Sequence, residues 1–282
     1  MNTCLFVSDL HGKMSRYEAL FRLIKKEKPD FVFIGGDLLP HRGGFREGYS
    51  GLNTDFVSGF LIPKFTKLQQ SMDCSYPEIF LIPGNDDRKS EFEKITEGEN
   101  EDLWRNIHNR CIVMGKYRIY GYACVPPTPF RIKDWERFDL KPGKTEGCIP
   151  PPEGVFSQEM PFDIDTGTID EDLQALVYDE DMSFGVFLFH SPPFDTFLDQ
   201  ADTGKPTPVP VGSKAIRNLI ESRQPYITMH GHIHESASLS GEWKQTFGRT
   251  LSFSAAHNGP ELSVVRFQLH DPTSATRILI KA

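Results

Sequence analysis

Five short apolar runs in this chain each lead directly into residues that can bind metal ions. The runs CLFV, FVFI, IFLI, GVFLF and YITM are followed by SDLHG, GGDLLPH, PGNDD, HSPP and HGHIH. The candidate ligands in these segments are Asp9, His11, Asp37, Asn85, His190, His232 and His234. Carboxylate, imidazole and amide groups without a cysteine suit Mn, Fe or Zn better than a soft thiolate site would. The pattern therefore predicts a metal cluster with oxygen and nitrogen ligands.

The spacing of these residues favours a cluster that holds two ions. Asp9 and His11 are two positions apart, so their side chains share a face on an extended exit from a strand, and His232 and His234 have the same spacing. Two divalent ions about 3.5–4 Å apart need a bridging ligand, which a carboxylate provides best. Asp37 is the candidate bridge because it ends the FVFI run, after two glycines that allow close backbone approach.

The elements that must position these residues are buried strands of a mostly parallel sheet. Each run has four or five residues rich in Val, Ile and Phe, and ligands of open α/β sheets collect at the carboxyl ends of the strands. We expect a helix over 14–27, with a capping box of Ser15 and Glu18, and further helices near 55–71 and 213–222. The expected strands and β-rich segments are 3–7, 31–34, 79–82, 118–124, 184–189, 226–230, 236–243, 249–255, 262–269 and 276–280. Two sheets packed face to face, with helices outside, would satisfy this order.

A segment rich in proline and then in acidic residues interrupts the pattern at about 125–182. It has little periodicity apart from a possible short helix near 170–178, and it shows no second core. We predict one domain over 1–282 with this segment as an insertion. A surface excursion and a lid over the site are both open alternatives, since long loops in compact domains are often functional.

Composition excludes several classes of protein. The chain has 282 residues, 38% hydrophobic and 25% charged, so a sizeable core is expected. The net charge of −8 argues against a nucleic-acid partner or an anionic membrane surface. No run reaches the roughly 18–20 apolar residues of a membrane span, and a first strand at about Thr3 leaves no room for a signal peptide. Five cysteines without a CxxC spacing predict reduced thiols in a cytoplasmic protein of unknown oligomeric state.

The ordered series SDLHG, GGD, PGND, H and HGHIH resembles the motifs of the calcineurin-like metallophosphoesterase superfamily over residues 9–234. The resemblance implies a four-layer αββα sandwich of two mixed β-sheets flanked by helices. It implies that Asp9, His11, Asp37 and His234 hold one metal, and that Asp37, Asn85, His190 and His232 hold the other. It also implies that a hydroxide between two divalent ions (Mn²⁺, Fe²⁺/Fe³⁺ or Zn²⁺) attacks phosphorus in line.

Two positions depart from that resemblance. Many members have a histidine after the GN pair that helps to protonate the leaving group, whereas this chain has Asp86. Two neighbouring cations would hold the carboxyl of Asp86 ionised, so His41 or His230 is a better candidate for the acid. At SAAHNGPEL, where many members have an Asn-Pro-Gly-Ser turn, His257 and Asn258 have no evident role. Three arginines near the motifs, Arg42, Arg46 and Arg88, could clamp a phosphate.

The leading hypothesis is a hydrolase that cleaves the phosphodiester, or else the phosphomonoester, of a small molecule. Asp37, Asn85 and His41 are its candidate catalytic residues. The alternative is a catalytically inactive scaffold or protein-binding module on the same fold, although such a descendant would be expected to lose ligands. A nuclease is a third hypothesis, which the net acidity argues against.

Overall fold

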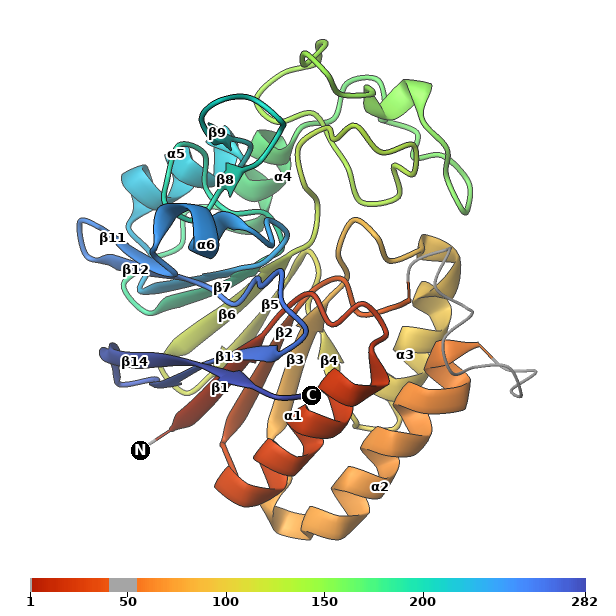
Figure 1. Ribbon diagram of the computed structural model, residues 1–282, viewed down its shortest axis with the longest axis vertical. Helices are drawn as coiled ribbons and strands as arrows, with labels where there is room; N and C mark the ends of the chain where they lie inside the picture. The colour runs from red at the N-terminus through yellow and green to blue at the C-terminus, as the bar shows by residue number, and fades with distance from the viewer. Residues whose placement is uncertain (1, 41–54) are drawn as a thin grey trace.

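A computed structural model describes residues 2–40 and 55–282 of the chain. Its main body is a four-layer α/β sandwich in which two six-stranded sheets face each other between helices (Figure 1). Among the described residues, no helix is long and apolar enough to cross a membrane. The predicted fold class is therefore confirmed.

The first sheet has parallel strands in its centre and antiparallel strands at one edge. Strands β1 to β4 are mutually parallel, and β13 pairs antiparallel with both β1 and β14. Parallel pairing brings the carboxyl ends of β1, β2 and β3 to one edge. In spatial order the strands are β14 (Asp271–Ile280), β13 (Leu262–Gln268), β1 (Thr3–Val7), β2 (Phe31–Gly35), β3 (Glu78–Ile82) and β4 (Arg105–Asn106).

The second sheet is also mixed, with four parallel strands between two antiparallel edge strands. A separate hairpin of β8 (Gln200–Ala201) and β9 (Val209–Pro210) lies beyond the carboxyl end of β7. In spatial order the six strands are β11 (Lys244–Phe247), β12 (Thr250–Ser254), β10 (Ile227–His230), β7 (Gly185–Phe189), β6 (Tyr117–Tyr122) and β5 (Arg110–Met114).

Alternation along the strands divides the core into two parts. Phe6, Phe33 and Phe80 face the second sheet and belong to a large aromatic cluster between the sheets. Phe33 stacks on Phe267 of β13, and the ring of Phe267 packs at a tilt against Phe253 of β12, with the two ring centroids 5.4 Å apart. The intervening residues of β1, β2 and β3 face a second apolar cluster beneath the helices on the outer side. The first sheet is thus packed on both faces, which fixes the positions of its strand ends.

The outer layers are helical. The first sheet is covered by α1 (Met14–Glu27), α2 (Ile62–Met72) and α3 (Phe92–Asn100), and a π-helical turn, η1 (Val57–Leu61), leads into α2. The second sheet is covered by α4 (Ile169–Leu176) and α5 (Lys214–Arg223), which contact each other (Figure 1). The short helix α6 (Ser236–Ser240) follows β10. Three 3₁₀ turns, η2 (Asp73–Ser75), η3 (Lys89–Glu91) and η4 (Pro151–Glu153), complete the described elements.

Two expectations about the bounds of helices and strands were wrong. Helix α1 begins at Met14, and its N-cap is Lys13, without a side-chain capping bond, so Ser15 is not the cap. The preceding loop sets this start, because Lys13 N donates to Leu10 O after two left-handed residues, His11 and Gly12. The segment 236–243 was expected to be β-rich, but it begins with helix α6. This helix ends at Gly241, whose left-handed backbone caps it.

The insertion is held together internally by isolated bridges between its loops rather than by a sheet. Its backbone pairs Ile132 with Val155 and Phe138 with Thr168. The predicted short helix near 170–178 is α4, and Thr168 and Glu171 form a capping box at its start. In Figure 1 the insertion projects from the end of the body at which β6 and β7 terminate. A single domain over 1–282 stays a prediction.

Candidate metal centre

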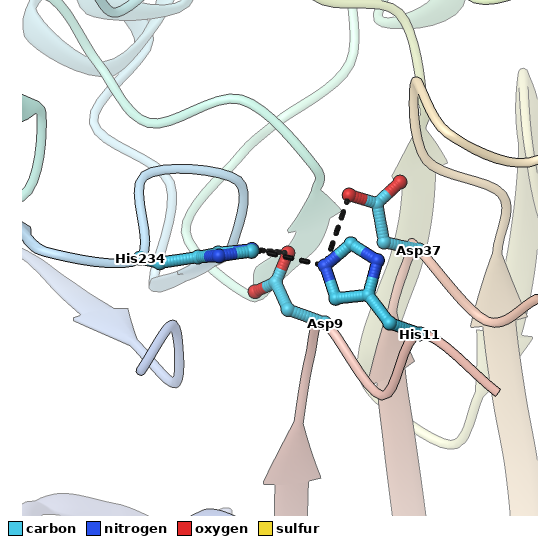
Figure 2. A group of neighbouring side chains, drawn as sticks. All are labelled: Asp9, His11, Asp37 and His234. Carbon is cyan, nitrogen blue, oxygen red and sulfur yellow. Dashed lines mark hydrogen bonds and ion pairs between the residues drawn. The ribbon is translucent and has the colours of Figure 1, made fainter. Parts of the chain in front are cut away.

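The candidate ligands lie where strands of both sheets end. Asp9, Asp37 and Asn85 follow β1, β2 and β3 of the first sheet. His190 follows β7, and the pair His232 and His234 follows β10. Because the sheets face each other with these ends at the same side, loops far apart in sequence converge on one place. Figure 2 shows four of the residues, Asp9, His11, Asp37 and His234, with their side chains directed toward one another.

The first group consists of Asp9, His11, Asp37 and His234, each of which offers one ligand atom within 4.8 Å of the others. Nε2 of His11 lies 3.0 Å from Nε2 of His234 and 3.7 Å from Oδ2 of Asp37. Nε2 of His234 also lies 3.4 Å from Oδ1 of Asp9. Two imidazoles and two carboxylates at these separations form a compact set of donors for a divalent cation.

The second group consists of Asp37, His190 and His232, again with one atom each within 4.8 Å of the others. Nε2 of His190 lies 3.4 Å from Oδ2 of Asp37 and 3.0 Å from Oδ1 of Asn85. Asn85 therefore adds a neutral oxygen to this group. Asp37 is common to both groups, which is the position that a bridging carboxylate requires.

Hydrogen bonds show that several of these atoms present lone pairs to the same space. Nδ1 of His190 lies 2.7 Å from the carbonyl oxygen of Gly35, so in the neutral ring it carries the proton and leaves the lone pair on Nε2. Nδ2 of Asn85 donates to Asp86 at 3.4 Å, which turns its carbonyl oxygen toward His190. In the neutral ring two acceptors then face each other across 3.0 Å, and either a proton on Nε2 or a cation between them satisfies both. Oδ2 of Asp9 is buried without a hydrogen-bond partner in the described part of the chain. A cation fits this donor set.

The cluster also attracts positive charge electrostatically. Burial lowers the pKa of His190, but the carboxylates of Asp37 and Asp9 outweigh it and raise that pKa to about 10. Burial raises the pKa of Asp37, yet His190 and His11 lower it well below its ordinary value. Burial and the neighbouring His190 lower the pKa of His232 to about 4, so this ring is neutral at pH 7.

The expected extended exits from β1 and β10 were wrong, because the backbone there passes through left-handed residues that bring the side chains together. Asp9, His11, Asp37 and His232 have φ values of 59°, 49°, 52° and 70°. A left-handed residue other than glycine costs roughly 1–3 kcal/mol, so four among the candidate ligands indicate that the surrounding fold imposes their orientation. Gly84 has a different role, since a Cβ there would lie 2.2 Å from Oδ1 of Asp37.

Asp87 is an organising residue that the sequence patterns did not single out. Its buried carboxylate accepts backbone N–H bonds from Leu38 at 3.0 Å, Leu39 at 2.8 Å and Gly84 at 2.8 Å. It therefore ties the loop that carries Asp37 to the loop that carries Asn85. Burial and the Asp37 carboxylate raise the pKa of Asp87 to about 7, against these N–H bonds. In the sequence, the only indication of this role was that Asp87 is the second aspartate of the GNDD motif.

Asp86 lies at the rim of the first group. Its backbone N–H donates to Oδ1 of Asp37 at 2.9 Å, and its Oδ2 lies 3.6 Å from Nδ1 of His11. The side chain is 27% exposed, so solvent and a bound molecule can reach it. At 3.6 Å this contact is longer than a hydrogen bond, so Asp86 acts on the His11 ring through its charge.

The remaining candidates have different outcomes. His230 is fully buried, and its ring nitrogens lie 2.9 Å from Ser191 O and 2.8 Å from Thr228 Oγ1, so both have partners within the fold. His257 pairs with Glu261 at 3.1 Å. Nδ2 of Asn258 donates to Ser238 at 3.3 Å. Arg88 is half-buried beside Asp87. His41, Arg42 and Arg46 lie outside the described residues.

The two-sheet sandwich and its cluster of aspartates and histidines define a metallophosphoesterase type of protein. The family model described as calcineurin-like phosphoesterase matches residues 3–236, and the chain belongs to that family. The predicted family is therefore confirmed. No curated protein matches the chain in a comparison of sequences.

Solved structures agree on the fold. TT1561 of Thermus thermophilus superposes with a TM-score of 0.58 at 16% identity, over 99% of this chain and 98% of that one. Another crystal structure gives a TM-score of 0.59 at 15% identity over the same fractions. A novel archaeal phosphodiesterase reaches 0.47 at 10% identity, with 99% of each chain covered, which is too distant to carry an argument. At these identities the likeness concerns the fold alone.

Proposed function

We propose that this protein hydrolyses a phosphate ester of a small molecule at a centre of two divalent metal ions. The observation that carries the proposal is the position of Asp37, which belongs to both groups of candidate ligands. Membership of the calcineurin-like phosphoesterase family supports the reaction class. Asp9, His11, Asp37 and His234 would hold one ion, and Asp37, Asn85, His190 and His232 would hold the other.

Each protein group has a defined task in this proposal. Divalent cations such as Mn²⁺, Fe²⁺ or Zn²⁺, when bound, would activate water for attack and neutralise charge on the phosphoryl oxygens. Asp37 would hold both ions through its carboxylate, and Asn85 would contribute an oxygen that adds no charge. Gly35 fixes the tautomer of His190 through the bond to Nδ1. His41 remains our candidate for the proton donor to the leaving group, together with Asp37 and Asn85 as catalytic residues.

We further propose a preference for diesters over monoesters, supported by the carboxylate of Asp86. A phosphomonoester carries a charge of about −1.5 to −2 at pH 7, whereas a diester carries about −1. A partly exposed carboxylate beside His11 repels the more highly charged substrate more strongly. Asp86→Asn should therefore raise monoester turnover relative to diester turnover. An unchanged ratio would remove Asp86 from the explanation of specificity.

The test of the function compares an aryl phosphodiester with the matching monoester, each with added Mn²⁺ and with chelator. We expect Mn²⁺-dependent turnover that favours the diester. Preference for the monoester would replace the phosphodiesterase by a phosphatase. Equal turnover with chelator and with Mn²⁺ would overturn the metal mechanism.

An inactive scaffold is a weaker conclusion for this chain. A scaffold has no need for strained backbone at Asp9, His11, Asp37 and His232. We propose a cytoplasmic enzyme, supported by five cysteines that are all free. The net charge of −8 continues to argue against a nucleic-acid substrate.

A further inference from the structure

We propose that Arg16 is a positioning residue that holds the Asp9 loop in its metal-binding conformation by joining it to the turn at 257–261. This inference rests on the proposed function, because it assigns a task toward the metal that Asp9 and His11 would bind. Arg16 lies in the first turn of α1, outside the motifs that carry the candidate ligands.

The buried position of the charged Arg16 side chain is energetically unfavourable. The residue is only 4% exposed, and burial lowers its pKa while the carboxylates of Asp9 and Glu261 act in the opposite direction. A cation near the N-terminus of a helix also opposes the helix dipole. Two bonds to carbonyl oxygens offset these penalties: Nη1 donates to Asp9 O at 2.6 Å, and Nη2 donates to Gly259 O at 2.5 Å.

The bond to Asp9 acts on a backbone that would otherwise relax. Asp9 has a φ of 59°, and its N–H donates to Gly36 O at 3.0 Å. Arg16 fixes the other side of the same residue by holding its carbonyl oxygen. The next anchor is His11 N, which donates to Asp37 O at 2.7 Å. Without Arg16, the peptide that follows Asp9 loses one of the contacts that hold it, and the Asp9 carboxylate and the His11 ring can shift together.

The turn that receives the second bond is itself fixed. His257 and Glu261 pair across it at 3.1 Å, and a Cβ at Gly259 would lie 2.4 Å from Nε2 of His257. The turn therefore presents the Gly259 carbonyl at a defined place, on a segment 243 positions from Arg16. This gives the departure at SAAHNGPEL a role, since the turn supports the Arg16 guanidinium rather than contributing a ligand.

The test is a calorimetric titration of the metal-free protein with Mn²⁺ alone. Arg16→Lys keeps the charge but loses the planar fork that reaches two carbonyls. We expect its affinity for Mn²⁺ to fall about tenfold or more, with the circular dichroism of the fold retained. Arg16→Gln, which can still donate hydrogen bonds but is shorter and uncharged, should show a similar or larger loss.

Arg223→Lys is the control, because Arg223 donates to Glu180 O at 2.8 Å and to Val177 O at 3.5 Å, neither of which lies in a ligand loop or in the turn at 257–261. We expect it to bind Mn²⁺ like the wild type. Wild-type affinity in both Arg16 variants, or an equal loss in Arg223→Lys, would overturn the positioning role. A wild-type protein that binds no Mn²⁺ would instead overturn the proposed function, so the two failures are distinguishable.

Discussion

We predict that the buried ion pair between Lys133 and Glu136 keeps the insertion ordered beside the candidate metal centre. Both side chains are 0% exposed, and Nζ lies 2.5 Å from Oε2. Lys133 also donates to Thr128 O at 2.8 Å, while Glu136 accepts Thr128 N at 2.8 Å and Thr128 Oγ1 at 2.5 Å. The three residues form a closed polar network inside the insertion.

This network is connected to the candidate metal centre through Asp134. Its carboxylate accepts Lys89 N at 3.0 Å and Ser157 N at 2.8 Å. Ser157 Oγ in turn accepts Ser90 N at 3.1 Å. Lys89 and Ser90 follow closely after the GNDD segment, so loss of order in the insertion would reach the rim of the site.

Glu136→Gln removes one charge with little change of shape. A pair of charges about 3 Å apart in an effective dielectric of about 20 interacts by roughly 5 kcal/mol. Removing one partner of a buried pair typically costs about 3–5 kcal/mol, because the other charge stays buried without compensation. We therefore expect a loss of about 3–5 kcal/mol in the free energy of unfolding of the insertion. Urea unfolding and hydrogen exchange over 125–168 would measure it.

The double variant Lys133→Met with Glu136→Gln provides the control, since it removes both charges and keeps an acceptor for Thr128. We expect it to lie within about 2 kcal/mol of the wild type, because exchanging a buried pair for uncharged groups is often close to neutral. A loss below about 1 kcal/mol in Glu136→Gln, or a double variant less stable than that single variant, would refute the reasoning.

Three other predictions concern the loops and the metal. Asp87→Asn places an amide among backbone N–H donors, so the free energy of unfolding measured in urea should fall by about 1–3 kcal/mol. Hydrogen exchange at Leu38 and Gly84 should become faster, and a variant as stable as the wild type would contradict this prediction. Burial, then the charges of Lys89 and Arg137, lower the pKa of His108 to about 3. The unfolded chain takes up this proton below about pH 6.5 and the folded chain does not, so stability should fall by about 2 kcal/mol from pH 6.5 to 5. In urea titrations at a series of pH values, the free energy of unfolding of His108→Asn should depend less on pH than that of the wild type. An equally steep pH dependence in the variant would contradict this prediction. Mn²⁺ at about 100 times its Kd should stabilise the folded protein by about 2.7 kcal/mol. A thermal scan should show a higher unfolding temperature with Mn²⁺ and a return to the original temperature with chelator. An unchanged unfolding temperature would show that the folded chain binds no such ion.

The strand ends were predictable because the apolar runs and the ligand types repeat together. Each run predicts a buried strand, and parallel pairing brings strand ends to one edge, so the sequence alone places Asp9, Asp37 and Asn85 near one another. The face-to-face sheets then bring His190, His232 and His234 to the same place. Their role as ligands is still a prediction.

The parts that failed depend on contacts between distant segments. Ser15 has the residue type and spacing of a cap, but the loop through His11 and Gly12 determines where α1 starts. Asp87 and Arg16 look like surface charges in sequence, and only their bonds to Leu38 and Gly259 reveal their tasks. Local patterns do not contain such long-range partners.

The most direct test of the two-metal centre is the Mn²⁺ content of purified wild-type and Asp37→Asn protein, measured by elemental analysis after removal of unbound metal. Because Asp37 contributes to both groups, we predict about two ions per wild-type chain and fewer than about one in Asp37→Asn, with an intact fold by circular dichroism. Retention of both ions in Asp37→Asn, or a wild-type protein that holds none, would contradict the two-metal centre.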